Sequence, residues 1–226
     1  MCGRYTLGDS HDLYRRFHVV KDELEVPERF NVAPTQHMPV VIREDSTRRD
    51  ASNRLTLMQW GLIPSWSKDP KPAGGLINAR IEGVLAKPSF RAPVRKRRCL
   101  VPCDGFYEWK REKGGKVPYY IRRKDKALFA FAGIYDVWHG TGGEIIEGYA
   151  ILTTRPNVLM APIHDRMPVI LDQAMEDFWL DIPGADITSL VATLENPFPA
   201  EALEAFPVST KVNSPKFDFP ELLRRE

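Results

Sequence analysis

The chain has 226 residues, of which 43% are hydrophobic and 27% charged, so it can bury a sizeable core and is neither collagen-like nor largely disordered. Lysine and arginine outnumber aspartate and glutamate by 32 to 30, a formal charge of +2. This balance gives no whole-chain attraction to nucleic acid, so any anion-binding site must be local.

Targeting signals are missing from the sequence. The N-terminal residues contain neither a basic segment followed by an apolar one nor a transit-peptide pattern, and no stretch reaches the roughly 18 apolar residues of a membrane span. We therefore expect a soluble, intracellular protein with no membrane partner, in the cytoplasm and nucleoid or in a nucleus, depending on the host. Its three cysteines, at positions 2, 99 and 103, are expected to be reduced thiols.

Helix signals in the first half of the chain are short. Residues 10–18 begin at a candidate Ser10 cap and place two apolar side chains one turn apart, and a second short helix is predicted around Ile81–Leu85, ended by Pro88. In the second half, Asp172 and Asp186 each precede an apolar periodicity typical of a core-covering helix.

Strand signals are clearer. Runs of β-branched and aromatic residues predict strands at 40–42, 55–60, 99–109, 117–122, 128–138, 149–153 and 169–171. Successive strands with short connections favour antiparallel pairing, the first two being joined by the polar loop at 44–53. We predict an α+β fold over residues 1–226: a single domain with a curved, mainly antiparallel sheet or barrel core, flanked by short helices.

Cys2 is the first candidate for chemistry. A small residue after the initiator methionine permits its removal, which would leave an N-terminal 1,2-aminothiol. The α-amine, with a pKa of about 7.7 to 8.0, and the thiol, with a pKa of about 8.5, are both usable near neutral pH. The amine can form an imine with an aldehyde, and the thiol can close that imine to a thiazolidine. By position alone, an accident of the start site is the favoured explanation of Cys2.

Two further residues are candidates for proton transfer. Glu108 lies between Tyr107 and Trp109 in a strand run, where burial would raise its pKa; the alternative is a solvated glutamate at a strand end. His164 follows an apolar pair in a loop and can exchange a proton near pH 7, although a single histidine is often structural.

The combination of motifs resembles one family over almost the whole chain. The motifs are MCGRY at 1–5, RFNVAPTQ at 29–36, WGLIPSW at 60–66, INAR at 77–80, CDGFYEWK at 103–110 and IHDRMPVIL at 163–171. Together with PVSTKVNS at 207–214, they occur in the order typical of SRAP proteins, the SOS response-associated peptidase family, which sense abasic sites in single-stranded DNA.

The resemblance implies roles for particular residues. Cys2 would form the thiazolidine crosslink with the ring-opened sugar, Glu108 and His164 would transfer protons, and Asn78 would orient the adduct. A turn-forming role at the start of a helix is the alternative for Asn78.

The resemblance also implies a DNA-binding set. Arg4 and Arg80 match phosphate-holding residues, and Arg166 belongs to the same implied set. Trp66 would stack on a base and Pro34 would shape the wall of the site. The alternatives are surface ion pairs for the arginines and core packing for Trp66.

Two other patterns remain outside this set. The basic run at 95–98 is either a phosphate track or a solvated segment. Cys99 and Cys103 are four residues apart in a predicted strand, so their side chains fall on the same face. Because no second pair of ligands has zinc-site spacing, we predict that both cysteines pack in the core and do not bind metal. No cofactor is expected.

The sequence thus predicts an abasic-site sensor that binds single-stranded DNA containing the lesion, captures it covalently and shields it. Protein partners are not identified. Two alternatives stay open: an N-terminal-nucleophile cysteine peptidase or amidase, with the α-amine as base, and a noncovalent single-strand-binding module. Two further activities of the same site, a lyase step and release of Met1 by a peptidase step, also stay open.

Overall fold

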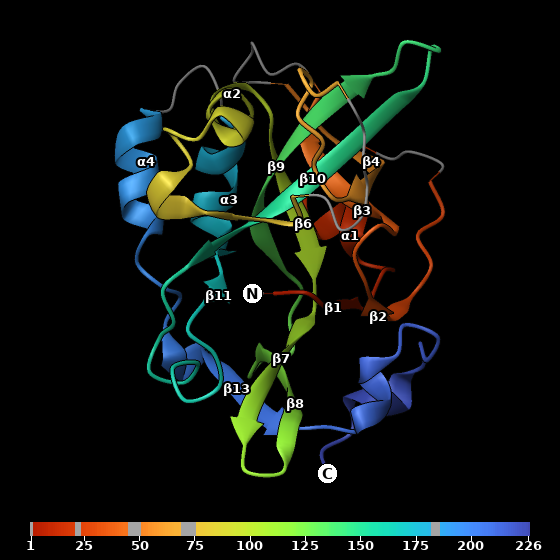
Figure 1. Cartoon of the computed structure of the whole chain (residues 1–226), viewed down its shortest axis with the longest axis vertical. Helices are drawn as coiled ribbons and strands as arrows, with labels where there is room; N and C mark the ends of the chain where they lie inside the picture. Colours follow the sequence, from red (N-terminus) through yellow and green to blue (C-terminus); the bar gives the residue numbers. More distant parts are fainter. Residues whose placement is uncertain (1, 21–23, 45–50, 69–75, 182–185) are drawn as a thin grey trace.

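A closed ring of β-strands forms the centre of the molecule (Figure 1). The computed structural model describes residues 2–20, 24–44, 51–68, 76–181 and 186–226; Met1 and most of the predicted loop at 44–53 lie outside them. Five strands close the ring through neighbouring pairings: β3 (His37–Arg43), β4 (Asn53–Trp60), β6 (Arg98–Cys103), β9 (Phe129–His139) and β10 (Ile145–Thr154). All these pairings are antiparallel except that of β4 with β10, so the predicted barrel is confirmed.

A second, fully antiparallel sheet packs against this barrel. Its strand order is β13-β8-β7-β1-β2. The strands are β1 (Tyr5–Leu7), β2 (Arg29–Val32), β7 (Gly105–Glu112), β8 (Gly115–Arg123) and β13 (Leu203–Pro207). The N-terminal strand β1 is therefore held between β7 and β2, which fixes the backbone that directly follows Cys2.

Buried aromatic rings connect β1 to the barrel. The Tyr5 ring contacts Trp60 and Phe131 edge-on, with centroids 5.1 and 6.1 Å apart. The Tyr5 hydroxyl lies 2.8 Å from that of Tyr149, in β10. Each such ring pair contributes about 0.5–1.5 kcal/mol beyond area burial. These contacts hold the start of the chain against the barrel wall.

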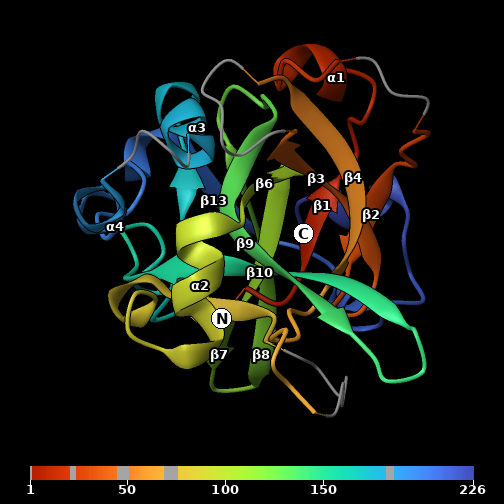
Figure 2. The same ribbon diagram turned by 90° about the horizontal axis from the view of Figure 1, so that it is seen from above.

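Short helices cover one side of the barrel. In Figures 1 and 2, α2 (Pro88–Lys96), α3 (Gln173–Leu180) and α4 (Ile187–Leu194) lie on that side. The predicted caps are confirmed: the Asp172 carboxylate accepts the Met175 N–H at 2.8 Å and Asp186 accepts the Thr188 N–H at 3.1 Å. No helix in the described part of the chain is long and apolar enough to cross a membrane.

Two helix predictions are wrong in extent. The segment at 10–18 contains only α1 (Leu13–Arg16), which begins after Asp12. Ser10 does not cap it, because its hydroxyl donates to the Val26 carbonyl at 2.7 Å. Around Ile81 the chain forms only the 3₁₀ turn η1 (Ile81–Gly83), and Pro88 begins α2 as its first residue instead of ending a helix, a position that tolerates proline.

Two strand predictions need correction in their boundaries. The run at 99–109 is two strands in different sheets, β6 and β7, separated at Asp104. The run at 169–171 contains only the short strand β12 (Ile170–Leu171), and a separate strand, β11 (Met167–Pro168), precedes it. A short strand β5 (Asn78–Arg80) pairs in parallel with β10. The remaining short elements are η2 (Ala200–Ala202), η3 (Thr210–Asn213) and η4 (Pro220–Leu223).

Candidate functional site

Cys2 lies fully buried just before β1. Its Sγ is 3.7 Å from the carbonyl oxygen of Arg4, to which the thiol donates a weak hydrogen bond. Burial raises the pKa of the Cys2 thiol well above its ordinary value, and the negative charge of Glu108 raises it further. The thiol is therefore protonated at neutral pH, and its reaction with an electrophile requires a nearby base.

Asn78 reaches the same point from the barrel. It is the first residue of β5, paired with Ile151 of β10. Its Nδ2 donates a 2.7 Å hydrogen bond to the backbone carbonyl of Cys2. Its Oδ1 is buried and accepts no hydrogen bond from the residues that the structure describes. The Asn78 amide therefore orients Cys2 through Nδ2, and its Oδ1 can still accept a hydrogen bond from a bound group.

Glu108 comes from β7, the neighbour of β1. The Tyr107 N–H donates to the Arg4 carbonyl at 3.0 Å, so the two strands are in register beside Cys2. Glu108 is only 2% exposed, and this burial raises its pKa, while the positive form of His164 lowers it in part. Glu108 is therefore buried, and the solvated alternative is wrong.

His164 completes the cluster from the loop before β11. The Met160 carbonyl accepts its backbone N–H at 2.9 Å, and its Nδ1 accepts the Arg166 N–H at 3.0 Å. The side chain is 27% exposed and lines a cleft of about 400 Å³ together with Trp109 and Arg111. The buried carboxyl of Glu108 thus lies close to the Cys2 thiol, and the solvent-connected imidazole of His164 lies close to Glu108, an arrangement suited to proton transfer.

The three predicted DNA-binding arginines have different environments. Arg4 is half-buried, and burial lowers its pKa; its Nη1 donates to Asn31 Oδ1 at 3.0 Å and to the Val212 carbonyl at 3.1 Å. Arg80 is exposed at the end of β5. Arg166 is nearly buried, with its guanidinium in a salt bridge. Among the three, Arg80 has its guanidinium most open to a phosphate.

Trp66 and Pro34 lie in turns. Trp66 is 63% exposed in a turn closed by the Ser67 N–H donating to the Pro64 carbonyl at 2.9 Å. The core-packing alternative for Trp66 is therefore wrong. Pro34 is half-buried, next to Thr35, whose φ of 75° lies in the left-handed region that a threonine rarely adopts.

Comparison with known proteins places these residues in a family. The family model for the SOS response associated peptidase, SRAP, matches residues 1–215. The chain belongs to the SRAP family.

Relatives of known name span most of the chain. The abasic site processing protein YoqW of Bacillus subtilis is 44% identical, over 99% of each chain. The abasic site processing protein HMCES of Gallus gallus is 36% identical, over 86% of this chain and 65% of that longer relative. A crystal structure of a Bacteroides thetaiotaomicron protein superposes with a TM-score of 0.87 at 30% identity, covering both chains completely.

Sequence reasoning missed a half-buried carboxyl, that of Asp104, which supports the SRAP site. Asp104 accepts the Gly8 N–H at 2.7 Å, the Asp9 N–H at 3.2 Å and the Thr6 hydroxyl. It thus fixes the far end of β1, the strand that begins three residues after Cys2. The signal available in the sequence was an aspartate followed by glycine inside an apolar run, a pattern typical of a strand break.

The basic run at 95–98 is not a continuous track in this SRAP chain. Arg95 and Lys96 are exposed at the end of α2, whereas Arg98 is buried and its guanidinium donates to the carbonyls of Val94 and Asp181, at 3.1 and 3.0 Å. Burial lowers the Arg98 pKa to about 10. Cys99 and Cys103 are both buried in β6, as predicted for packing.

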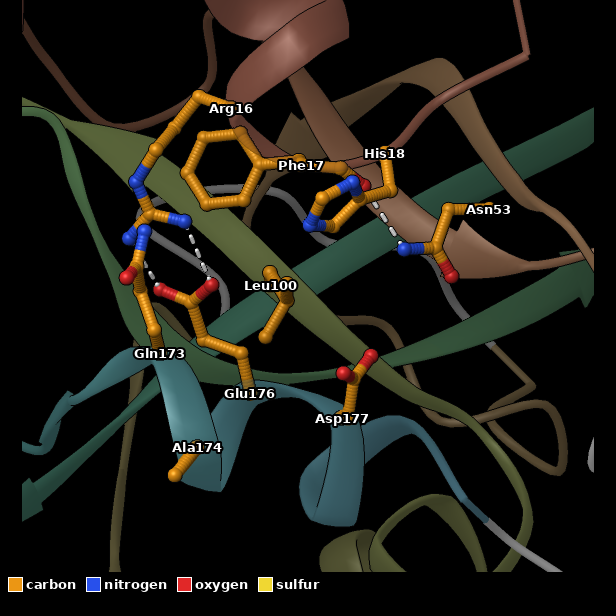
Figure 3. Close-up of a pocket in the computed structure, with 9 residues that line it drawn as sticks. All are labelled: Arg16, Phe17, His18, Asn53, Leu100, Gln173, Ala174, Glu176 and Asp177. Atoms are coloured by element: carbon orange, nitrogen blue, oxygen red, sulfur yellow. Dashed lines mark hydrogen bonds and ion pairs between the residues drawn. The ribbon is translucent and has the colours of Figure 1, made fainter.

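Another cleft lies outside the predicted site, between α1, β4, β6 and α3 (Figure 3). It encloses about 480 Å³. One wall carries the salt bridge between Arg16 and Glu176, 2.8 Å long and mostly buried. None of the nine site residues predicted from the SRAP resemblance lines it.

Proposed function

We propose that this protein processes abasic sites by covalent capture, through a thiazolidine between Cys2 and the aldehyde of the lesion in single-stranded DNA. The observation that supports the proposal is the 2.7 Å hydrogen bond from Asn78 to the Cys2 carbonyl, with the buried Glu108 close to the Cys2 thiol and His164 close to Glu108. The names of the SRAP relatives supply the lesion.

The reaction starts with opening of the sugar hemiacetal. The hydroxyl on C1 must lose its proton while the ring oxygen gains one, and two groups of different pKa beside the substrate can perform both transfers. The buried carboxyl of Glu108 and the imidazole of His164 fit this requirement. Glu108 lies close to the Cys2 thiol and His164 lies close to Glu108, so the aldehyde would form near its nucleophile.

The amine then forms the first bond. After removal of Met1, the α-amine of Cys2 attacks the aldehyde carbon, and the carbinolamine loses its oxygen as water to give an imine. A general acid must protonate the leaving hydroxyl. The Nε2 of His164 can donate this proton, because its Nδ1 already accepts the Arg166 N–H.

Ring closure uses the thiol. The sulfur of Cys2 attacks the imine carbon, the S–H proton leaves, and the imine nitrogen gains a proton. The net reaction joins one aldehyde to one aminothiol with loss of one water. Since burial keeps the thiol protonated, Glu108 is the group placed to accept the S–H proton.

The burial of the Cys2 thiol weighs against the peptidase alternative. Attack on an amide uses the thiol at the first step, and the Cys2 thiol is fully buried, so this reaction would need a base from the outset. The aldehyde reaction instead begins with the amine and uses the thiol only against a reactive imine.

Denaturing electrophoresis with intact-mass measurement tests the proposal. The protein is mixed with a single-stranded oligonucleotide carrying one abasic site, and the expected product has the summed masses minus one water, on an uncut strand. Cys2→Ala should give no durable adduct, because its imine is trapped only by reduction or proceeds to strand cutting. Cys99→Ala, which removes another buried thiol, is the matched control and should crosslink like the wild type.

Two further experiments test whether the crosslink requires the aldehyde of the DNA and the α-amine of the protein. A tetrahydrofuran analogue of the abasic site lacks the aldehyde and should give no adduct. A form with a noncleavable N-terminal extension lacks the free α-amine and should fail to crosslink while remaining folded. A heat-stable adduct with Cys2→Ala, or with the extended form, would reject the aminothiol mechanism.

A further inference from the structure

Arg166 is held by a set of contacts inside the protein. Its Nη1 and Nη2 lie 2.6 and 2.9 Å from the two carboxylate oxygens of Glu82. Nη2 also donates to the carbonyl of Thr153, in β10, at 2.5 Å. The Arg166 side chain is 11% exposed and that of Glu82 is 42% exposed. This two-pronged geometry fixes the plane of the guanidinium.

The backbone of Arg166 in turn contacts the proposed proton donor. Its N–H donates to Nδ1 of His164 at 3.0 Å. A ring nitrogen that accepts a hydrogen bond carries no proton, so neutral His164 has its proton on Nε2. The Arg166 amide thereby selects the tautomer that offers an N–H donor from the other side of the ring.

A second group contacts the same nitrogen in the other charge state. Asp165 Oδ1 lies 3.0 Å from His164 Nδ1, where it can accept a hydrogen bond once the ring is protonated. The Asp165 side chain is 83% exposed, so water weakens this contact. The other charged or titratable groups facing His164 are Glu108 of β7 and Arg111, across the cleft.

We propose that Glu82 is a positioning residue: by holding the Arg166 guanidinium, it fixes the Arg166 backbone amide and thereby the Nε2–H tautomer of His164. The inference rests on the proposed proton-transfer role of His164. Its physical reason is that a nearly buried guanidinium needs a charged partner. Without Glu82, Arg166 would turn toward water, and the amide beside His164 would move with it.

Glu82 links two segments that are distant in sequence. It lies in η1, directly after the β5 strand that carries Asn78 and Arg80, whereas Arg166 directly precedes β11. The salt bridge therefore couples the segment that orients Cys2 to the loop that carries His164. Hydrogen bonding to Arg166 also lowers the pKa of Glu82, so the pair stays charged at neutral pH.

Long-range ¹H–¹⁵N correlation spectra of ¹⁵N-histidine-labelled protein test the inference without DNA. Wild-type neutral His164 should show the Nε2–H tautomer. Glu82→Ala should give a mixture of tautomers, and Glu82→Gln, which keeps one acceptor for Arg166, a smaller but measurable change. Asp125→Ala is the matched control, since Asp125 makes the same two-pronged contact, to Arg123, away from the His164 loop. Unchanged His164 signals in both Glu82 variants would overturn the proposal.

Crosslinking rates provide the second measurement. Glu82→Ala should slow adduct formation roughly tenfold, a part of the 10²–10⁴ that a proton-transfer group supplies, and should shift the histidine limb of the pH–rate profile. A purely structural role would lower the melting temperature and leave the pH profile in place. If wild type forms no adduct but Glu82→Ala still changes the tautomer, the proposed function fails and the positioning role stands.

Discussion

The side-chain amide of Asn78 donates a 2.7 Å hydrogen bond to the main-chain carbonyl of Cys2, joining the barrel to the first residues of the chain. Cys2 precedes β1, so only its C-terminal side is held by strand pairing. The Asn78 contact supplies a second point of attachment. Two attachments restrict rotation of the backbone that carries both the amine and the thiol.

Replacing Asn78 should therefore slow capture without weakening DNA binding. Asn78→Asp keeps the shape but puts a carboxylate oxygen against the Cys2 carbonyl, which repels it. Because a displacement of about 1 Å at a reacting group can cost about 10²-fold in rate, we expect a loss of that order in crosslinking, measured by single-turnover gel assays. Asn196→Asp, whose Oδ1 accepts from Arg155 at 2.8 Å, is the control. Equal rates for both variants would remove Asn78 from the site.

Glu108→Gln should stabilise the protein while slowing its reaction. Burial raises the Glu108 pKa in the folded state, so between the unfolded and folded pKa values the folded chain holds more protons. Stability therefore falls as pH rises through this window. Glutamine removes the cost of ionisation, and the variant should melt at a higher temperature than wild type at neutral pH. The difference should shrink as the pH falls and wild-type Glu108 becomes protonated.

The same variant should crosslink about 10²–10⁴-fold more slowly, since the amide accepts no proton at neutral pH. Thermal unfolding across a pH series and single-turnover crosslinking are measured on the same samples. A Gln variant that crosslinks at the wild-type rate would exclude Glu108 as the proton-transfer group.

The sequence pattern predicted helix starts correctly where the capping hydrogen bond joins residues that are close in sequence. The Asp172 and Asp186 caps bind N–H groups two or three residues further along, within the range that a sequence motif covers. The Ser10 prediction failed because the hydroxyl binds Val26, a partner that only tertiary packing supplies. Helix α2 was not predicted because it contains Pro93, a residue that ordinarily breaks helices.

The candidate site shows the same division. The motifs identified Cys2, Asn78, Glu108 and His164, and in the structure Asn78 contacts Cys2, Glu108 lies close to the Cys2 thiol, and His164 lies close to Glu108. The exposure of individual arginines could not be assigned from the motifs. Arg97 is partly exposed, whereas its neighbour Arg98 is buried because its guanidinium donates to backbone carbonyl groups in the core. The partner of Arg166 is Glu82, 84 residues away in sequence, a contact that depends on the pairing of β5 with β10.

Arg80→Ala should weaken DNA binding through loss of one phosphate contact. Arg80 is exposed at the end of β5, near the segment that orients Cys2. Each phosphate contact on a single strand contributes about −0.7 to the slope of log affinity against log salt, so the slope should become shallower by about that amount. Fluorescence anisotropy with intact single strands across a salt series measures it.

Arg91→Ala is the matched control for this charge. Arg91 is equally exposed but lies on α2, and its removal should change the slope less. Identical slopes for the two variants would show that Arg80 contributes only to the general charge of the protein.

Trp66→Ala should reduce affinity for single-stranded DNA without reducing stability. The indole is 63% exposed in a turn, so its removal leaves no cavity in the core. Stacking of an aromatic side chain on a base contributes about 1–3 kcal/mol, and a loss in that range is expected by anisotropy. Trp66→Phe keeps an aromatic face and should retain part of the affinity.

Phe178→Ala, which removes a 59% exposed ring from α3, is the matched control. It should leave DNA affinity unchanged, because Phe178 lies on the helical cover, away from the Cys2 cluster. Melting curves separate the two explanations for Trp66. A fall in melting temperature with unchanged affinity would assign Trp66 to packing. A fall in affinity at constant melting temperature would assign it to DNA binding.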